Sequence, residues 1–159
     1  MNPFKSHKGF TLLELILTIS LMGILGVSVI PLITSTQAFG LDNATRKLES
    51  DIRFAQSMAM TKGEAYGFRN ISDGKNTTFE VYIVATGLPE KSPYSREPLQ
   101  EDISDKFKGI FFKDNNHHIT FDAQGNPTFI TGGQYITLKN QDAEVKAIFI
   151  NNVGLITIP

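Results

Sequence analysis

A single acidic residue, Glu14, stands inside a long apolar segment near the start of the chain. After it, no charged residue occurs from Leu15 through Leu41. A carboxylate at the centre of a membrane-spanning helix costs roughly 2.5 to 3.5 kcal/mol, and less near the interface. A cation at about 4 Å attracts it by roughly 4 kcal/mol at an effective dielectric near 20, before desolvation is subtracted. The position of Glu14 therefore predicts ion pairing with a cation from a partner.

The other residues that could support catalysis or hold a metal form no recognisable site. His117 and His118 are adjacent, and neighbours on a strand point to opposite faces, so we expect a surface or turn pair instead of a chelate. Asp102, Asp105 and Asp114 lack the alternating oxygen ligands and positioned glycine of a calcium loop. The chain has no cysteine, and its serines belong to no nucleophile motif. We expect no enzyme activity, metal or cofactor.

Nucleic-acid binding is also not expected. The 159 residues include 15 basic and 16 acidic side chains, with a formal net charge of -1, so no global positive field attracts phosphates. In residues 133–159, Lys139 and Lys146 are balanced by Asp142 and Glu144, which leaves little counterion release to drive binding.

A small patch remains as the basis for a DNA-binding alternative. Lys106, Lys108 and Lys113 occur close in sequence to the aromatic residues Phe111 and Phe112. Cations beside an aromatic ring are the combination that binds single-stranded nucleic acid.

The apolar segment that carries Glu14 is long enough to cross a membrane as one helix. A bilayer core takes roughly 20 helical residues, fewer than the run from Leu15 to Leu41 contains. Lys5 and Lys8 precede the run, and positively charged flanks stay in the cytoplasm. We therefore expect a single crossing with the N terminus cytoplasmic. A secretory signal has a shorter apolar core followed by a small-residue cleavage site, so we expect this segment to stay with the protein.

An amphipathic helix is predicted after the apolar segment. Its apolar face is formed by Leu41, Leu48, Ile52, Ala55 and Ala59, which keep near-helical spacing opposite polar residues. Lys62 provides a cation in the last turn, and Gly63 suits the left-handed cap. Met58 and Met60 are expected to fill the core. One helix from Phe10 to Lys62 would thus have a membrane-spanning half and a sheet-packing half.

Short strands separated by turn residues are predicted beyond Gly63, because β-branched and aromatic runs alternate with turn chemistry. The expected strands are Glu64–Ile71, Thr77–Val84, Gly109–Lys113, His118–Asp122, Thr128–Thr131, Gln134–Leu138, Val145–Ile150 and Val153–Ile158. A helix followed by consecutive strands is typical of an α+β domain with mostly antiparallel sheet. Ala85–Asp105 is long for a loop, which leaves open a binding loop or a missed short element.

The start of the chain resembles a known signal. The string Gly-Phe-Thr-Leu-Leu-Glu at residues 9–14 follows a short basic leader and precedes a long apolar helix, as in type IV pilins and the pseudopilins of type II secretion. The resemblance extends through Gly23 and Pro31, and Gly26 lies between them. Glycines permit close helix packing and proline loosens a helix locally, so these residues are expected to serve packing and bending.

The resemblance implies how the precursor is processed and assembled. A prepilin peptidase would cut between Gly9 and Phe10 and methylate the new amine of Phe10. Glu14 would meet the terminal amine of a neighbouring subunit. The expected partners are that peptidase, other pilins or pseudopilins, and an inner-membrane assembly platform. The expected localisation is the bacterial inner membrane and an envelope filament.

The later part of the chain resembles one branch of this group. Ile119, Phe121 and Gly125, followed by Ile148, Ile150, Gly154 and Ile156, resemble the end of the GspH/FimT-like branch. Major pilins usually close a C-terminal loop with a disulfide, and major pseudopilins carry a calcium loop there. The missing cysteines and the few acids of the last twenty residues therefore favour a minor subunit.

These observations divide the chain into four parts. Residues 1–9 are predicted to be a leader, 10–40 a transmembrane or filament-core helix, 41–63 an amphipathic helix and 64–159 a β-rich extracytoplasmic domain. The predicted function is that of a minor pseudopilin of type II secretion. A minor type IV pilin for pilus biogenesis, adhesion or DNA uptake remains the alternative, and a singly anchored envelope protein unrelated to filaments is a third possibility.

Overall fold

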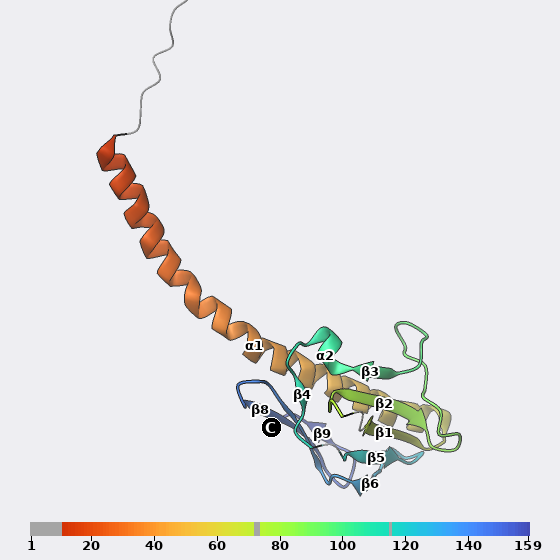
Figure 1. The fold of residues 1–159 in the computed structure, drawn as a ribbon. Helices are drawn as coiled ribbons and strands as arrows, with labels where there is room; N and C mark the ends of the chain where they lie inside the picture. Colours follow the sequence, from red (N-terminus) through yellow and green to blue (C-terminus); the bar gives the residue numbers. More distant parts are fainter. Residues whose placement is uncertain (1–10, 72–73, 115) are drawn as a thin grey trace, which may run out of the picture. The chain divides into compact units, whose positions relative to one another are not determined.

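In the computed structural model, described residues are 11–71, 74–114 and 116–159, and the side chains of 25–38 are not among them. The chain forms two compact units, Met1–Thr36 and Gln37–Pro159. Helix α1 (Leu12–Lys62) begins in the first unit and continues in the second (Figure 1). Among the described residues, no helix combines the length and apolar character needed to cross a membrane.

Helix α1 ends where the sequence predicts. Lys62 is its last residue, and Gly63 follows with φ +69° and donates its N–H to the Ala59 carbonyl at 3.0 Å. Glycine adopts this left-handed conformation without the steric penalty of a Cβ. The cap therefore fixes the point at which the chain turns from helix into the sheet.

Two antiparallel sheets make up the rest of the second unit. The first has the order β3-β2-β1-β5-β6, and the second has the order β4-β7-β8-β9. The strands are β1 (Tyr66–Ile71), β2 (Thr78–Ile83), β3 (Gln100–Asp102), β4 (Phe111–Phe112), β5 (His118–Phe121), β6 (Pro127–Thr131), β7 (Tyr135–Lys139), β8 (Val145–Ile150) and β9 (Ile156–Thr157). The α+β class and its antiparallel pairing are confirmed, and the described strands form two sheets.

Several boundaries differ from the expected ones. Val153–Ile158 contributes only the two-residue β9, because the Asn151 side chain accepts hydrogen bonds from the N–H groups of Val153 and Leu155 and holds that stretch in a turn. Ala85–Asp105 contains short elements that the sequence analysis missed, namely β3 and the start of α2 (Ile103–Lys106). Strands and helices of three or four residues are too short for periodicity to reveal them.

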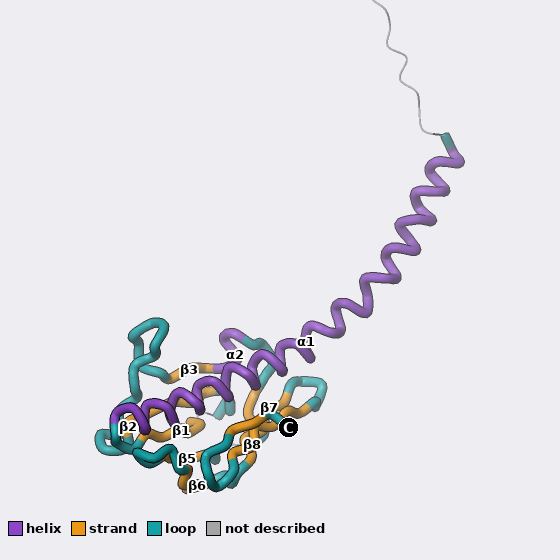
Figure 2. The backbone as a smooth tube through the Cα atoms, turned by 180° about the vertical axis from the view of Figure 1, so that it is seen from behind, coloured by secondary structure: helices purple, strands orange, loops and turns teal. Residues whose placement is uncertain are grey.

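The core lies between α1 and the two sheets. Leu41, Leu48, Ile52, Ala55 and Ala59 are each at most 2% exposed, which confirms the predicted helix face. Their partners from the sheets are Tyr66, Phe68, Phe79, Val81, Phe112, Ile119, Phe121, Ile136, Leu138, Ile148, Ile150 and Ile156. Figure 2 shows this part of α1 lying along the strands. Met58 packs against the core, but Met60 is 50% exposed, so the expectation for Met60 was wrong.

A chain of charged side chains connects α1 to β3. Lys47 Nζ lies 2.5 Å from an Asp51 carboxylate oxygen and 3.1 Å from Glu101, and Glu101 also pairs with Lys106 at 3.1 Å. The Asp51 side chain is only 7% exposed. Burial raises the pKa of Asp51 to about 6, although the hydrogen bond from Lys47 opposes this change.

Replacing Asp51 with Asn is expected to change how stability depends on pH. Because the pKa of Asp51 is higher in the folded protein, its contribution to stability is complete below pH 3.8 and is lost as pH rises through about 6. The stability advantage of wild type over Asp51→Asn should therefore fall by about 2 kcal/mol between pH 4 and 7. Urea unfolding of the Gln37–Pro159 unit at several pH values measures this. A difference independent of pH would contradict the assignment.

Candidate assembly site

The first turn of α1 is capped by Thr11. Its hydroxyl accepts a hydrogen bond from the Glu14 N–H at 3.2 Å, and its carbonyl accepts from Glu14 N–H at 3.1 Å and Leu15 N–H at 3.2 Å. A hydroxyl residue three positions before a glutamate is the sequence pattern of a helix capping box. The sequence analysis missed Thr11, although the string Thr-Leu-Leu-Glu contains that pattern.

The cap places the carboxylate of Glu14 in the first helical turn. A negative charge there interacts favourably with the positive end of the helix dipole, an effect of about 0.3 to 1 kcal/mol. This is a modest local reason for an acid at this position. The Glu14 side chain is exposed and can therefore pair with a second charge.

The surroundings of Glu14 are otherwise apolar. Leu12 and Leu13 are 77% and 76% exposed, and the other large apolar side chains through Ile24 are each at least 55% exposed. Thr18 and Ser20 donate their hydroxyls to backbone carbonyls of the same helix, both at 2.8 Å. The described surface of this unit thus offers apolar side chains and satisfied hydroxyls, which fits burial in lipid or against other apolar helices.

No cation within this part of the helix can pair with Glu14, because residues 11–45 contain no Lys, Arg or His. A cation close to this carboxylate must therefore come from outside residues 11–45 or from another molecule. The pairing of Glu14 with a partner charge stays a prediction. The expected donor, the amine of Phe10, lies outside the described residues, as does the Gly9–Phe10 bond.

The predicted packing residues are only partly visible. A Cβ built on Gly23 would meet nothing within 4 Å, so this position offers space for a close approach of another helix. Gly26 and Pro31 lie in the part of α1 whose side chains are outside the described set. Their packing and bending roles stay predictions.

The histidines and aspartates for which the sequence predicts no metal site lie at separate places in the structure. Asp102 caps α2 by accepting the Ser104 N–H at 2.9 Å. His118 forms a hydrogen bond with the Tyr82 hydroxyl on the outer face of the first sheet. His117 is 2% exposed, so the expected surface position was wrong for it. Burial lowers the pKa of the His117 imidazole, which favours its neutral form.

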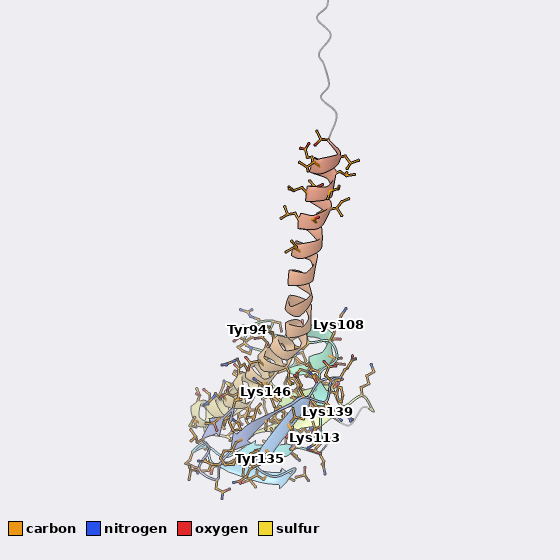
Figure 3. All side chains as sticks on the ribbon, turned by 90° about the vertical axis from the view of Figure 1, so that its left-hand side faces the viewer. Tyr94, Lys108, Lys113, Tyr135, Lys139 and Lys146 are labelled. Atoms are coloured by element: carbon orange, nitrogen blue, oxygen red, sulfur yellow. The ribbon has the colours of Figure 1, made fainter. Side chains whose placement is uncertain are left out.

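The small basic and aromatic patch considered for DNA does not form as expected. Lys106 pairs with Glu101 at 3.1 Å, and Phe112 is fully buried. Instead, Lys139 Nζ lies 4.9 Å from the centre of the Phe111 ring, across the β4–β7 pair. Figure 3 shows Lys108 apart from Lys113 and Lys139.

An apolar helix with one carboxylate, joined to a helix-and-sheet domain, is the architecture of a pilin-like subunit. The sequence matches the profile described as "Prokaryotic N-terminal methylation motif" over residues 4–30. It also matches the profile "Type II transport protein GspH" over residues 44–154. The second match covers more than half of the chain, and the protein therefore belongs to the GspH family of the pilin-like group.

Solved structures of both kinds of minor subunit share this fold. The crystal structure of the type IV minor pilin FimU from Pseudomonas aeruginosa PAO1 matches with a TM-score of 0.55 and 19% identity, covering 78% of this chain and 91% of that chain. The minor pseudopilin EpsH from the Vibrio cholerae type 2 secretion system matches with a TM-score of 0.55 and 11% identity, covering 75% and 95%. Comparison with curated protein sequences finds no significant match.

Proposed function

We propose that this protein is the precursor of a minor pseudopilin, a structural subunit of an envelope filament for type II protein secretion. The observation that carries the proposal is the succession, in one chain, of the methylation motif at residues 4–30 and the GspH domain at 44–154. The subunit would act by assembly, without catalysis of its own.

In this proposal the precursor enters the inner membrane with its N terminus in the cytoplasm. Residues 1–9 form the leader, 10–40 the transmembrane and filament-core helix, 41–63 the amphipathic helix and 64–159 the extracytoplasmic domain. Prepilin peptidase cuts after Gly9 and methylates Phe10. The mature subunit then leaves the assembly platform by docking on neighbouring pseudopilins, with Glu14 facing the Phe10 amine of one of them.

Processing is tested by the mass of the N-terminal peptide. Protein isolated from cells with the peptidase should begin at N-methylated Phe10, whereas protein from peptidase-deficient cells should keep residues 1–9. Gly9→Leu should reduce cleavage at least tenfold, because a bulky side chain replaces a hydrogen next to the scissile bond. Lys8→Ala is the matched control and should be cleaved normally. A wild-type protein that keeps its leader in peptidase-positive cells would contradict the proposal.

A minor type IV pilin is the second candidate, favoured by the fold shared with FimU. FimU and EpsH match with equal TM-scores, and at these identities the likeness concerns the fold alone. Deletion of the gene separates the two functions when secreted enzymes, surface pili and uptake of labelled DNA are measured in one strain. Lost secretion with normal pili supports the pseudopilin, and lost pili or uptake with normal secretion supports the pilin.

A further inference from the structure

Two segments of the second unit contain no charged residue, although 19% of the whole chain is charged. They are residues 123–138 and 147–159. They include β6, most of β7, most of β8, and β9 together with the turns beside them. Charged residues are normally frequent on the surface of a soluble domain and are depleted at the centre of protein interfaces.

The turns of these segments are joined to one another and to α1. The Gln56 amide donates hydrogen bonds to the Gly125 carbonyl at 2.9 Å and to the Gly154 carbonyl at 2.8 Å. The Gln134 amide donates to the Asn152 side chain at 2.7 Å. The β5–β6, β6–β7 and β8–β9 turns thus form one continuous surface.

Large apolar side chains project from this surface. Val153 is 76% exposed, Leu155 55% and Tyr135 54%. Met60 is 50% exposed and lies beside the β5–β6 turn, because a Cβ built on Gly125 would be 2.9 Å from the Met60 sulfur. We define the uncharged turn surface by these four side chains. Figure 3 shows Tyr135 at the end of the second sheet, beyond the labels of Lys113, Lys139 and Lys146.

Hydrogen bonds within the chain fix the conformation of the uncharged turn surface. Asn151 accepts hydrogen bonds from the N–H groups of Val153 at 3.0 Å and Leu155 at 2.8 Å, which fixes the β8–β9 turn. At the margin, the Asp122 carboxylate accepts from the N–H groups of Gln124 and Asn126 and is therefore occupied within its own turn. A rigid apolar surface loses little conformational entropy on binding.

We propose that the uncharged turn surface is a docking site for an uncharged, apolar surface of a different filament subunit. Charge complementarity supports this partner. Arg53 of α1 lies beside Leu155, because it donates a hydrogen bond to the Ile156 carbonyl, but it is already paired with Glu49 at 2.8 Å. A partner that placed a charged side chain over Val153 and Leu155 would therefore lose hydration of that charge without gaining an unpaired counter-ion. An anionic membrane surface would instead require basic residues, which both segments lack. The proposal rests on the assembly function proposed above.

Cysteine labelling in the full-length chain tests the proposal, because the protein has no cysteine of its own. Val153→Cys is compared with Leu88→Cys, a 64% exposed position on another loop. In cells that assemble the filament, a membrane-impermeant maleimide should react at least tenfold more slowly with Val153→Cys than after detergent dissociation. The rate for Leu88→Cys should not change. Equal rates for Val153→Cys in both states would overturn the proposal.

A charge placed on the surface provides an independent readout. Val153→Lys should reduce incorporation into the filament at least tenfold while the unfolding temperature stays within 2 °C of wild type, and Leu88→Lys should have no effect. Cross-linking of full-length Val153→Cys chains to one another, or protection of Val153→Cys from the maleimide in membranes that hold no filament, would overturn the proposal in favour of another occupant. Glu14→Ala separates the two hypotheses. If incorporation into the filament needs Glu14 but Val153→Cys stays reactive in the filament, the docking site alone is overturned. If the wild-type chain enters no filament, the proposed function is overturned.

Discussion

Glu14→Ala is expected to lower incorporation of the subunit into filaments at least tenfold while leaving it processed and inserted in the membrane. The raw attraction between the carboxylate and an amine at about 4 Å is roughly 4 kcal/mol, and a net remainder of about 1.4 kcal/mol after desolvation already gives a factor of ten. Removing the carboxylate also removes an insertion cost of roughly 2.5 kcal/mol, so membrane insertion should not suffer.

Quantitative immunoblotting of sheared filaments and membranes measures this effect. Leu13→Ala changes a neighbouring side chain that is 76% exposed without removing a charge, and it serves as the control. Glu14→Gln keeps the shape and hydrogen-bonding capacity but not the charge, and it should fail like Glu14→Ala. Normal incorporation of either Glu14 variant would show that ion pairing is not the basis of assembly.

Gly154→Ala is expected to destabilise the Gln37–Pro159 unit by about 3 kcal/mol. Gly154 has φ +83°, where an L residue carries a steric penalty of about 1 to 2 kcal/mol. The new Cβ would also lie 2.5 Å from the Gly125 carbonyl oxygen and 2.5 Å from the Gln56 amide nitrogen. Relieving these contacts separates Gln56 from its two carbonyl partners, each hydrogen bond contributing about 1 kcal/mol.

Gly133→Ala separates the two causes of that loss. Gly133 also has a positive φ, +69°, but a Cβ there would meet nothing within 4 Å. This variant should lose only the backbone term of about 1 to 2 kcal/mol. Urea unfolding of the wild-type unit and both variants provides the comparison. Equal losses in the two variants would mean that the contact of the β5–β6 and β8–β9 turns with Gln56 adds no stability.

Processing, docking at the uncharged turn surface and the pH response of Asp51 test different parts of the molecule. The cleavage experiment concerns the precursor before assembly. Cysteine labelling concerns the assembled state, and the Asp51 variant concerns only folding of the second unit. Their outcomes can therefore be interpreted separately.

The sequence by itself determined the features that depend on local pattern. The string at residues 9–14 indicated the pilin-like signal, and the apolar periodicity from Leu41 to Ala59 predicted the core face of α1. Lys62 and Gly63 predicted where the helix ends. Each of these signals is contained in a short window, because helix periodicity and capping depend on neighbours within one or two turns.

Only the tertiary structure decided which distant residues meet. Gln56 joins Gly125 to Gly154, and the exposed apolar side chains of Met60 and Val153 share one surface through that connection. The same applies to His117, whose burial depends on strands that lie on either side of it. Pairing of strands far apart in sequence follows from the packing of the whole core, and hydrophobic pattern specifies which face is buried but not which turn lies beside it.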